Sequence, residues 1–256
     1  MITAVFNSAQ TLEDSLCSVA GQTWPEVEHI VIDGGSTDGS LEIISRHQGA
    51  IAHTRSERDD GVYDALNKGI GSATGDVIGF MHADDTYASP TALERVAKAF
   101  EDPSVGAVYG DLVYVDKDDL SRVVRYWRAG PFRRRRLAHG WMPPHPTFYV
   151  RREHYQRLGG FDTRYRIAAD YENVLRILWS GGVKPAYIPE VLVRMRTGGI
   201  SNRSLPNIVR KSLEDFSAMR QNGIGALQGV LLKNVTKLPQ LVRRGAQMSA
   251  ATRSAA

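Results

Sequence analysis

The sequence predicts an α/β fold: a mixed, mostly parallel sheet flanked by helices, with a helical extension at the C-terminal end. Two observations predict it. Short apolar segments alternate with amphipathic helical segments through the first half of the chain, which is the pattern of parallel strands joined by crossover helices. One segment, residues 77–81, is short and apolar throughout, as expected of a strand buried on both faces at the centre of such a sheet.

The first half is organised as strands that each lead into a helix. Strands are predicted at residues 1–6, 27–32, 51–54 and 77–81. The helices behind them carry apolar stripes around Leu16, Ile44, Leu66 and Val96. Asn7 and Ser8 offer a cap for the first helix, and Pro90 suits the first turn of the fourth.

The second half has less regular alternation. Its predicted elements are a hairpin, a strand and two helices, at residues 105–115 with 123–127, 147–150, 151–159 and from about 169 onward. Residues 183–196 are predicted to form two short strands around Pro189, because proline cannot donate to a ladder. From Pro206 onward we expect two basic helical segments, followed from Met248 by a low-complexity end.

Composition limits the class of protein. The chain has 256 residues, of which 42% are hydrophobic and 23% charged, enough for a sizeable core. Cys17 is the only cysteine, which excludes a disulfide framework and argues against a cysteine-built metal site. We find no basic leader ahead of an apolar segment and no apolar run long enough to span a membrane. A cytoplasmic protein is therefore predicted.

Charge divides the chain into two parts. Residues 1–121 contain 7 Lys/Arg and 21 Asp/Glu, whereas residues 122–256 contain 25 and 7. The net charges of these parts, −14 and +18, sum to the overall +4. An acidic part suits a metal ion, and a basic part suits phosphates, anionic lipid or nucleic acid.

Asp84 and Asp85 are the first candidates for a metal site. They follow the predicted central strand, at the strand end where open α/β sheets bind ligands. Two adjacent carboxylates raise each other's pKa, and a hard cation such as Mn²⁺ or Mg²⁺ relieves their repulsion. The alternative is a polar turn without a ligand.

Other polar groups gather after neighbouring strands. Asp33 ends a predicted strand ahead of a Gly-rich turn, so its carboxylate can accept from a uracil ring or a ribose hydroxyl, although the same residues also make a good helix entrance. The turn lacks the G-x-G-x-x-G pattern of a dinucleotide site. Asp60 and Lys68 can reach a diphosphate or a sugar hydroxyl, with helix capping and a solvated face as the alternative.

Further candidates lie in the basic part. Asp170 follows a glycine-rich turn at the start of a helix, where it is either an N-cap or a general base that takes a proton from an acceptor hydroxyl. His145, between two prolines, is a candidate ligand for metal or phosphate, or else an ordinary core or surface histidine. The arginine run 133–136, with Arg135 and Arg136, suits pyrophosphate or anionic lipid, or is a solvated loop.

Together these motifs resemble the family 2 inverting glycosyltransferases of the GT-A fold, particularly bacterial enzymes that build surface polysaccharides or glycolipids. The resemblance covers roughly residues 2–180, in the family's order. It rests on Phe6-Asn7, Ile30-Val-Ile-Asp33-Gly-Gly-Ser-Thr-Asp38-Gly, Asp60-Gly-Val-Tyr-Asp-Ala-Leu-Asn67-Lys-Gly69, Ala73-Thr-Gly-Asp76, Ala83-Asp84-Asp85, Gly159-Gly-Phe-Asp162 and Ala169-Asp170-Tyr171.

The resemblance implies roles for individual residues. Asp33 would bind the nucleotide, and Phe6 would line the base pocket. Asp84 and Asp85 would be the DxD-type pair that binds the sugar nucleotide and its Mn²⁺ or Mg²⁺ ion. Asp170 would be the base, activating an acceptor hydroxyl for attack on the anomeric carbon with inversion of configuration.

The resemblance also implies a domain organisation and partners. Residues 1–200 would be the catalytic domain, with a nucleotide-binding half to about 115 and an acceptor half from about 116. Residues 201–256 lie outside the resemblance, and their own pattern predicts a basic helical extension with a disordered end. The donor would be a nucleotide-diphospho-sugar and the acceptor a glycan or a lipid-linked molecule. The basic amphipathic segment 227–244 suits the inner face of the cell membrane, or else packs on the catalytic domain.

The chain departs from the family pattern at three places. The first strand lacks several apolar residues that members usually have. Gly34 stands where many members carry a second Asp, and Ala169 replaces an acidic residue that often precedes the base. The last two departures concern details of donor binding.

Two other classes fit less of the sequence. A sugar-nucleotide nucleotidyltransferase places a Gly-rich loop with a basic residue directly after its first strand, where this chain has Asn7-Ser-Ala-Gln10. A non-enzymatic nucleic-acid binder would need aromatic residues interleaved with basic ones in a single-strand groove. It would also leave the acidic loops unexplained, so we expect no nucleic-acid partner.

Overall fold

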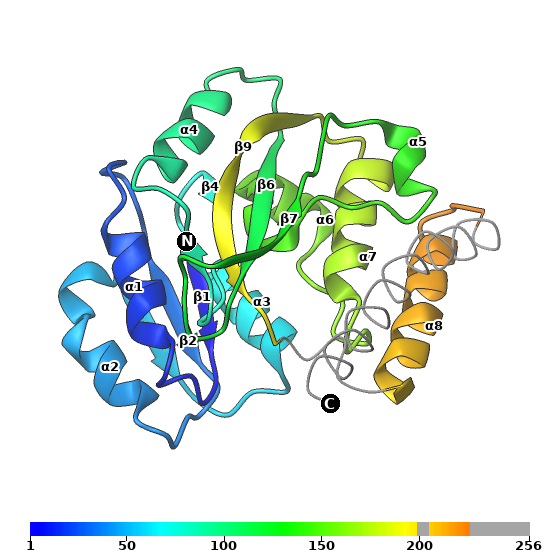
Figure 1. Ribbon diagram of the computed structural model, residues 1–256. Helices are drawn as coiled ribbons and strands as arrows, with labels where there is room; N and C mark the ends of the chain where they lie inside the picture. Colours follow the sequence, from blue (N-terminus) through cyan, green and yellow to red (C-terminus); the bar gives the residue numbers. More distant parts are fainter. Residues whose placement is uncertain (199–204, 226–256) are drawn as a thin grey trace, which may run out of the picture.

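The computed structural model describes residues 1–198 and 205–225, which form two adjoining sheets with helices packed around them (Figure 1). The first sheet consists of β1 (Ile2–Val5), β2 (Ile30–Asp33) and β3 (His53–Ser56), all parallel. The second has six strands in the order β4-β8-β6-β9-β5, with β7 paired to β6. The predicted mixed sheet with flanking helices is confirmed.

The two faces of the parallel sheet are covered by different helices. Val31 of β2 packs in a cluster with apolar residues of α1 (Leu12–Ala20) and α2 (Ser40–Arg46). Ile30 and Ile32 point to the other face, where they pack with Leu66 of α3 (Val62–Ser72). This alternation follows from the two-residue period of a strand, and it makes β2 buried on both faces, as the apolar run in the sequence requires.

The predicted central strand is short and joins the two sheets. β4 (Val77–Ile78) pairs antiparallel with β8 (Tyr149–Arg151). Just beyond β4, Phe80 and Ile2 form an isolated parallel β-bridge, in which Met81 N–H donates to the Ile2 carbonyl oxygen at 3.0 Å. Parallel pairing is otherwise confined to β1–β3 and to β6 with β9, so the strand is not flanked by parallel neighbours on both sides as the sequence suggested.

The second sheet is built on a long hairpin. β6 (Ala107–Val115) and β7 (Val123–Trp127) pair antiparallel, as predicted. β9 (Pro185–Arg196) is one strand, so the prediction of two short strands was wrong. Its pairing with β6 skips Pro189, since Gly110 faces Ile188 while Asp111 faces Val191. A bulge therefore absorbs the missing N–H of the proline without ending the strand.

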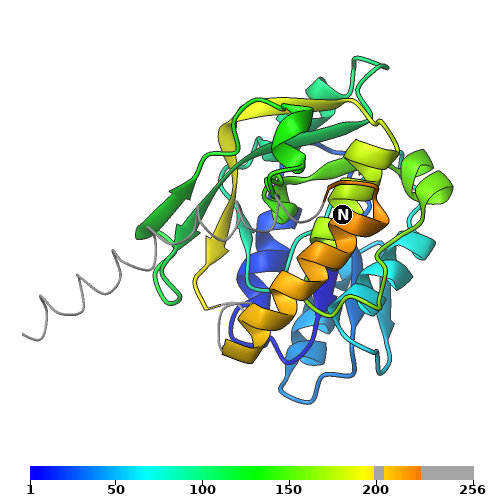
Figure 2. The same cartoon turned by 90° about the vertical axis from the view of Figure 1, so that its right-hand side faces the viewer.

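The remaining elements are one short strand, the other helices and the short helical turns. β5 (Thr86–Tyr87), which the sequence did not reveal, pairs antiparallel with β9. The helices and short helical turns are η1 (Gln48–Ala50), α4 (Ala92–Ala99), α5 (Arg134–Leu137), η2 (His145–Thr147), α6 (Arg152–Leu158), α7 (Ala169–Leu175), the π-helical η3 (Arg176–Ser180) and α8 (Leu205–Gln221). α8 lies beside α7 in both views (Figures 1 and 2).

Two helix starts differ from the prediction. The N-cap of α1 is Thr11, and Ser8 contributes its carbonyl oxygen, which accepts from Thr11 N–H and Leu12 N–H. Pro90 precedes α4, whose N-cap is Thr91. The second predicted basic helix and the segment 227–244 lie outside the described residues. Within the described part of the chain, no helix combines the length and apolar character needed to cross a bilayer.

A reciprocal side-chain contact joins the two halves of the chain. Asn67 on α3 donates from Nδ2 to the Phe161 carbonyl oxygen at 2.8 Å and accepts from Phe161 N–H at 2.7 Å. Gly160 allows this approach, because a Cβ there would lie 2.3 Å from Asn67 Oδ1. The amide thus satisfies both backbone groups of one residue, as a strand neighbour would.

We expect Asn67→Ala to lower the free energy of unfolding by about 1–3 kcal/mol, because it leaves the N–H and carbonyl of Phe161 without partners. Urea denaturation measures the change. Gln48→Ala, at an exposed position of η1, is the control and should change stability little. A wild-type midpoint for Asn67→Ala would show that the contact does not hold the halves together.

Candidate active site

Polar loops follow the three parallel strands at one edge of the sheet. The register pairs Val5 with Asp33 and Asp33 with Ser56, so the chain leaves all three strands at the same level. The first two loops interlock: Asn7 Oδ1 accepts from Thr37 N–H at 2.9 Å, and Ala9 N–H donates to Asp38 Oδ2 at 2.9 Å. This is the edge at which open α/β sheets bind ligands.

Asn7 holds this junction in a left-handed conformation, with φ of 47°. Such a backbone is uncommon for a residue other than glycine and is most often adopted by Asn or Asp. The neighbouring Phe6 is 61% exposed, unusual for a large aromatic side chain. The predicted role of Phe6 in a base pocket stays a prediction, and its exposed ring beside the interlocked loops is available for stacking.

Asp33 is fully buried, and its carboxylate stabilises the loop that follows it. Its carboxylate accepts from Gly35 N–H at 3.0 Å, from Ser36 N–H at 3.1 Å and from the Ser56 hydroxyl at 2.7 Å. These bonds shape the Gly-rich turn, which is the helix-entrance role that the sequence left open. Direct contact between Asp33 and a nucleotide stays a prediction.

A carboxylate that the sequence did not single out lies against this turn. Asp59 reaches Gly34 from the loop after β3, and a Cβ on Gly34 would stand 2.5 Å from Asp59 Oδ2. The same side chain accepts from Gly61 N–H through Oδ1 at 2.9 Å. The absence of a side chain at position 34 therefore makes room for the Asp59 carboxylate.

Lys68 is held by carboxylates of its own neighbourhood. Its Nζ lies 2.8 Å from Glu57 and 3.0 Å from Asp64, one turn earlier on α3. The hydrogen bonds that Lys68 donates, first to Glu57 and then to Asp64, raise the pKa of Lys68, so it stays charged. Asp60 is exposed at the start of this helix, and its N–H donates to Asp64. The predicted contacts of Lys68 and Asp60 with a donor stay predictions.

Asp84 and Asp85 end the segment that joins the sheets. Asp85 is fully buried and its Oδ1 accepts only a backbone N–H, from Arg196 at 3.3 Å. Its Oδ2 finds no hydrogen-bond partner among the described residues. Burial first, and the charge of Asp84 second, raise the pKa of Asp85 well above its ordinary value of 3.8.

This pair fits a hard divalent cation. Both side chains offer carboxylate oxygens, one of them buried and unpaired, and Mn²⁺ or Mg²⁺ is typically held by one or two carboxylates with substrate phosphates. In residues 1–198 and 205–225, no third His, Cys, Asp or Glu ligand atom closes a cluster with the two. The remaining coordination positions are left to a ligand or to water.

Arg196, at the end of β9, organises this site without neutralising Asp85. Its guanidinium donates to the Asp84 carbonyl oxygen at 3.0 Å and to the Lys117 carbonyl oxygen at 3.2 Å, and it pairs with the Asp14 carboxylate. Its role is not predictable from the sequence, since nothing in the local pattern of a strand end distinguishes this residue.

Two histidines lie beside the carboxylates. His145 stacks on Phe80, with ring centroids 5.4 Å apart, and its ring lies 5.6 Å from that of His82. His145 is buried, and its Nε2 has no partner among the described residues. Burial lowers the pKa of His145 to about 4. The charge of Asp170 opposes this shift, and the charge of His82 adds to it. The imidazole is therefore neutral at physiological pH.

Asp170 lies in the first turn of α7, after the N-cap Ala168, so the simple alternative that Asp170 is itself the N-cap was wrong. Its Oδ1 accepts from Tyr171 N–H at 2.7 Å. Tyr63, on α3, donates to the Ile167 carbonyl oxygen at 2.9 Å. Burial, and then the charge of Asp170, raise the pKa of the Tyr63 hydroxyl well above 10. Asp170, Tyr63 and His145 thus belong to one electrostatic neighbourhood.

The arginine run forms the short helix α5 and packs on aromatic rings. Arg136 lies over Trp141 at 4.8 Å and donates to the Ala129 carbonyl oxygen, while Arg134 lies over Trp179 at 4.3 Å. Arg135 is exposed. No contact recorded among the described residues joins Arg135 or Arg136 to the carboxylates, so their pyrophosphate or acceptor role stays a prediction.

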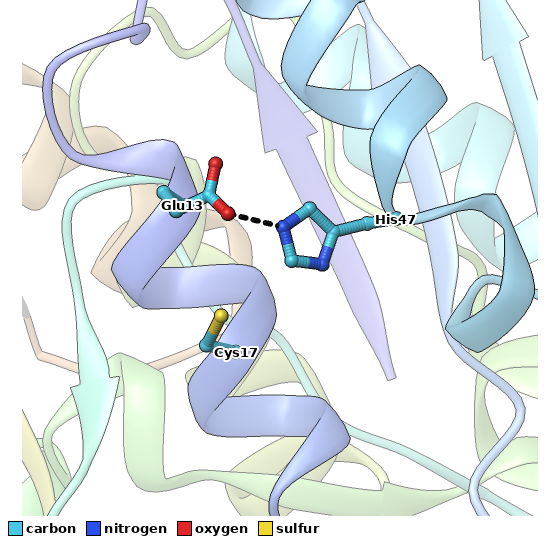
Figure 3. A group of neighbouring side chains, drawn as sticks. All are labelled: Glu13, Cys17 and His47. Carbon is cyan, nitrogen blue, oxygen red and sulfur yellow. Dashed lines mark hydrogen bonds and ion pairs between the residues drawn. The ribbon is translucent and has the colours of Figure 1, made fainter.

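A separate cluster of ligand-type side chains ties α1 to the end of α2 (Figure 3). The ligand atoms of Glu13, Cys17 and His47 lie within 4.8 Å of one another. Glu13 already accepts from His47 Nε2 at 2.6 Å and from Arg46 at 2.8 Å. Ser15, on another face of α1, contacts the His82 carbonyl oxygen. The cluster is thus a paired surface network, apart from the carboxylates of the site.

The buried charge of Asp85 predicts a dependence of stability on pH. Since its folded pKa is raised, the folded metal-free protein holds a proton that the unfolded chain releases from about pH 4 upward. Stability of wild-type protein in chelator should therefore fall as pH rises through this window, and Asp85→Asn should remove that part of the fall.

Thermal unfolding between pH 4 and pH 8 measures this effect, with the exposed Asp118→Asn as the matched control. The control should follow the wild-type curve. A lower unfolding temperature for Asp85→Asn than for wild type at pH 7, in chelator, would mean that the carboxylate has a compensating partner.

Comparison with known proteins identifies the family of the chain. The family model described as Glycosyl transferase family 2 matches residues 1–159. An uncharacterised glycosyltransferase of Mycobacterium tuberculosis is 34% identical over 211 residues, covering 82% of this chain and 79% of that protein. A PGL/p-HBAD biosynthesis glycosyltransferase of Mycobacterium bovis is 31% identical over 208 residues, covering 79% and 78%.

Solved structures share the fold at lower identity. The mannosyltransferase PcManGT from Pyrobaculum calidifontis, in complex with GDP-Man and Mn²⁺, superposes with a TM-score of 0.65 at 22% identity, covering 98% of this chain and 74% of that one. S. aureus TarS 1-349 in complex with UDP-GlcNAc gives a TM-score of 0.68 at 16% identity, covering 90% and 68%. The predicted GT-A fold is confirmed, and the chain belongs to glycosyltransferase family 2.

Proposed function

We propose that this protein is an inverting, metal-dependent glycosyltransferase. It moves a hexosyl or deoxyhexosyl group from a nucleotide-diphospho-sugar to a hydroxyl of a glycan or lipid-linked acceptor in surface polysaccharide or glycolipid synthesis. The observation that carries the proposal is the buried, unpaired carboxylate oxygen of Asp85, next to Asp84 and at the strand edge that holds the loops of the nucleotide-binding half.

The donor binds across this edge. Asp84 and Asp85 hold Mn²⁺ or Mg²⁺, which when bound supplies positive charge to the diphosphate that leaves. Phe6 stacks on the base, and Asp33 contributes to the nucleotide pocket through the turn that its carboxylate shapes. Support comes from the solved relatives, whose complexes contain GDP-Man with Mn²⁺ and UDP-GlcNAc.

Asp170 acts on the acceptor. Tyr171 N–H holds Oδ1, which orients the carboxylate so that Oδ2 takes the proton of the attacking hydroxyl. The hydroxyl oxygen then attacks the anomeric carbon from the face opposite the leaving diphosphate, and the configuration inverts. His145, which is neutral and whose Nε2 has no partner among the described residues, provides a hydrogen bond to a phosphate or acceptor oxygen.

We also propose a cytoplasmic location at the inner face of the cell membrane, with contact through the basic segment 227–244. The support is the charge pattern of that segment and the name of the mycobacterial relative, which places it in PGL/p-HBAD biosynthesis. A lipid-linked acceptor would be reached from such a surface.

We expect Asp170→Asn to lower kcat by about 10²- to 10⁴-fold, the contribution of a general base, while Asp85→Asn abolishes metal-dependent donor binding. The measurements are sugar transfer from UDP-, GDP- and dTDP-sugars and the rise in unfolding temperature with Mn²⁺ and nucleotide. Asp170→Asn should keep that rise. The exposed Asp118→Asn should match wild type in both assays.

The anomeric configuration of the product tests the inverting mechanism most directly. A product that retains the configuration of the donor sugar would exclude direct attack by the acceptor. Wild-type transfer by Asp170→Asn would remove Asp170 from the reaction. Folded protein that shows no metal-dependent rise with any of these donors would contradict the proposed function as a whole.

A further inference from the structure

The loop that leads to Asp170 is held by a helix from the C-terminal region. Glu214, on α8, accepts from three successive backbone N–H groups of this loop: Arg166 at 3.2 Å, Ile167 at 2.8 Å and Ala168 at 2.9 Å. One carboxylate thus fixes the chain direction directly before α7 begins at Ala169. α8 runs along α7 in Figure 2.

This contact holds the backbone that enters α7. The N-cap residue is Ala168, whose own side chain makes no capping bond. Glu214 accepts the N–H of this N-cap residue and those of the two residues before it. It also places a negative charge beside the helix start, where the helix dipole favours one. The entry to the first turn of α7, with Asp170 in it, is thus held by α8.

Two tyrosine contacts hold the same loop from either side. Tyr165 donates to Gln221 Oε1 at 2.9 Å, and its hydroxyl lies 3.2 Å from Ser217 Oγ, both on α8. On the other side, Tyr63 of α3 donates to the Ile167 carbonyl oxygen. The loop is therefore clamped between α8 and α3, with Glu214 making the largest number of its polar contacts.

We propose that Glu214 is a positioning residue for Asp170, so that α8 belongs to the catalytic apparatus. This rests on the proposed role of Asp170 as the base. The family model ends at residue 159, so neither Asp170 nor α8 is part of the matched region. The carboxylate of Glu214 sets where the first turn of α7 starts, and small displacements of a reacting group lower the rate of the chemical step strongly.

Glu214→Gln tests this, because the amide keeps the size of the side chain but offers one acceptor oxygen in place of two and brings donors toward the N–H groups. We expect kcat to fall about 10- to 100-fold, with the KM for donor and the Mn²⁺-nucleotide rise in unfolding temperature unchanged within about twofold. Glu153→Gln, on the exposed face of α6, is the matched control and should keep wild-type kcat.

A second readout is independent of activity. Amide hydrogen exchange of residues 165–171 should increase in Glu214→Gln and stay at the wild-type level in Glu153→Gln. Unchanged exchange in that loop would overturn the proposal even if the protein transfers no sugar with any donor. This separates the failure of the positioning role from the failure of the proposed function.

Two results in the kinetic assay would also overturn it. An unchanged kcat would show that Asp170 does not depend on Glu214. Equal losses in kcat and in donor binding, with a lower unfolding temperature, would show that Glu214 only stabilises the fold. Should Glu214→Gln fail to fold, Tyr165→Phe removes one hydroxyl of the same clamp, and a wild-type kcat with wild-type loop exchange in that variant would overturn the proposal.

Discussion

The carboxylate of Asp85 is the constraint on which the site depends. It is fully buried and receives one backbone N–H, and among the described residues no cationic side chain donates to it. Arg196 directs its guanidinium to Asp14 and to two carbonyl oxygens instead. Burying a charge without a partner is costly, and the proposed metal ion would supply the missing positive charge.

The surrounding structure keeps this carboxylate from relaxing. The segment before it is bonded to β1 through Met81 and Ile2, and Ser15 of α1 holds the His82 carbonyl oxygen at 3.0 Å. Arg196 anchors the other end through the Asp84 carbonyl oxygen. These bonds fix the backbone on both sides of the carboxylate, and Arg196 N–H holds its Oδ1.

α3 connects the two halves of the chain at the site. Tyr63 and Asn67, four residues apart, face the second half and bond to the Ile167 and Phe161 backbones. Asp64 and Lys68, the adjacent pair, face Glu57 in the loop after β3. Residues four apart lie on one face of a helix. Two adjacent faces of α3 therefore contact the two halves of the chain, one face for each half.

Local patterns gave much of the fold and some of the site. The strands and helices of the first half, the β6–β7 hairpin and the carboxylates at the strand edge follow from periodicity and turn residues. β5 was missed because two residues carry no period, and β9 was divided because Pro189 reads as a break unless a bulge absorbs it. Contacts such as that of Glu214 with Ile167 join distant positions, and single-sequence patterns contain no signal for them.

The space at Gly34 shows that a negative charge beside the Gly-rich turn can come from a residue outside that turn. The backbone is bare at this position, and Asp59 reaches over it from the next loop. The carboxylate beside the turn thus comes from the loop after β3. A side chain introduced at position 34 would have to displace this carboxylate, so a substitution there also moves the negative charge beside the turn.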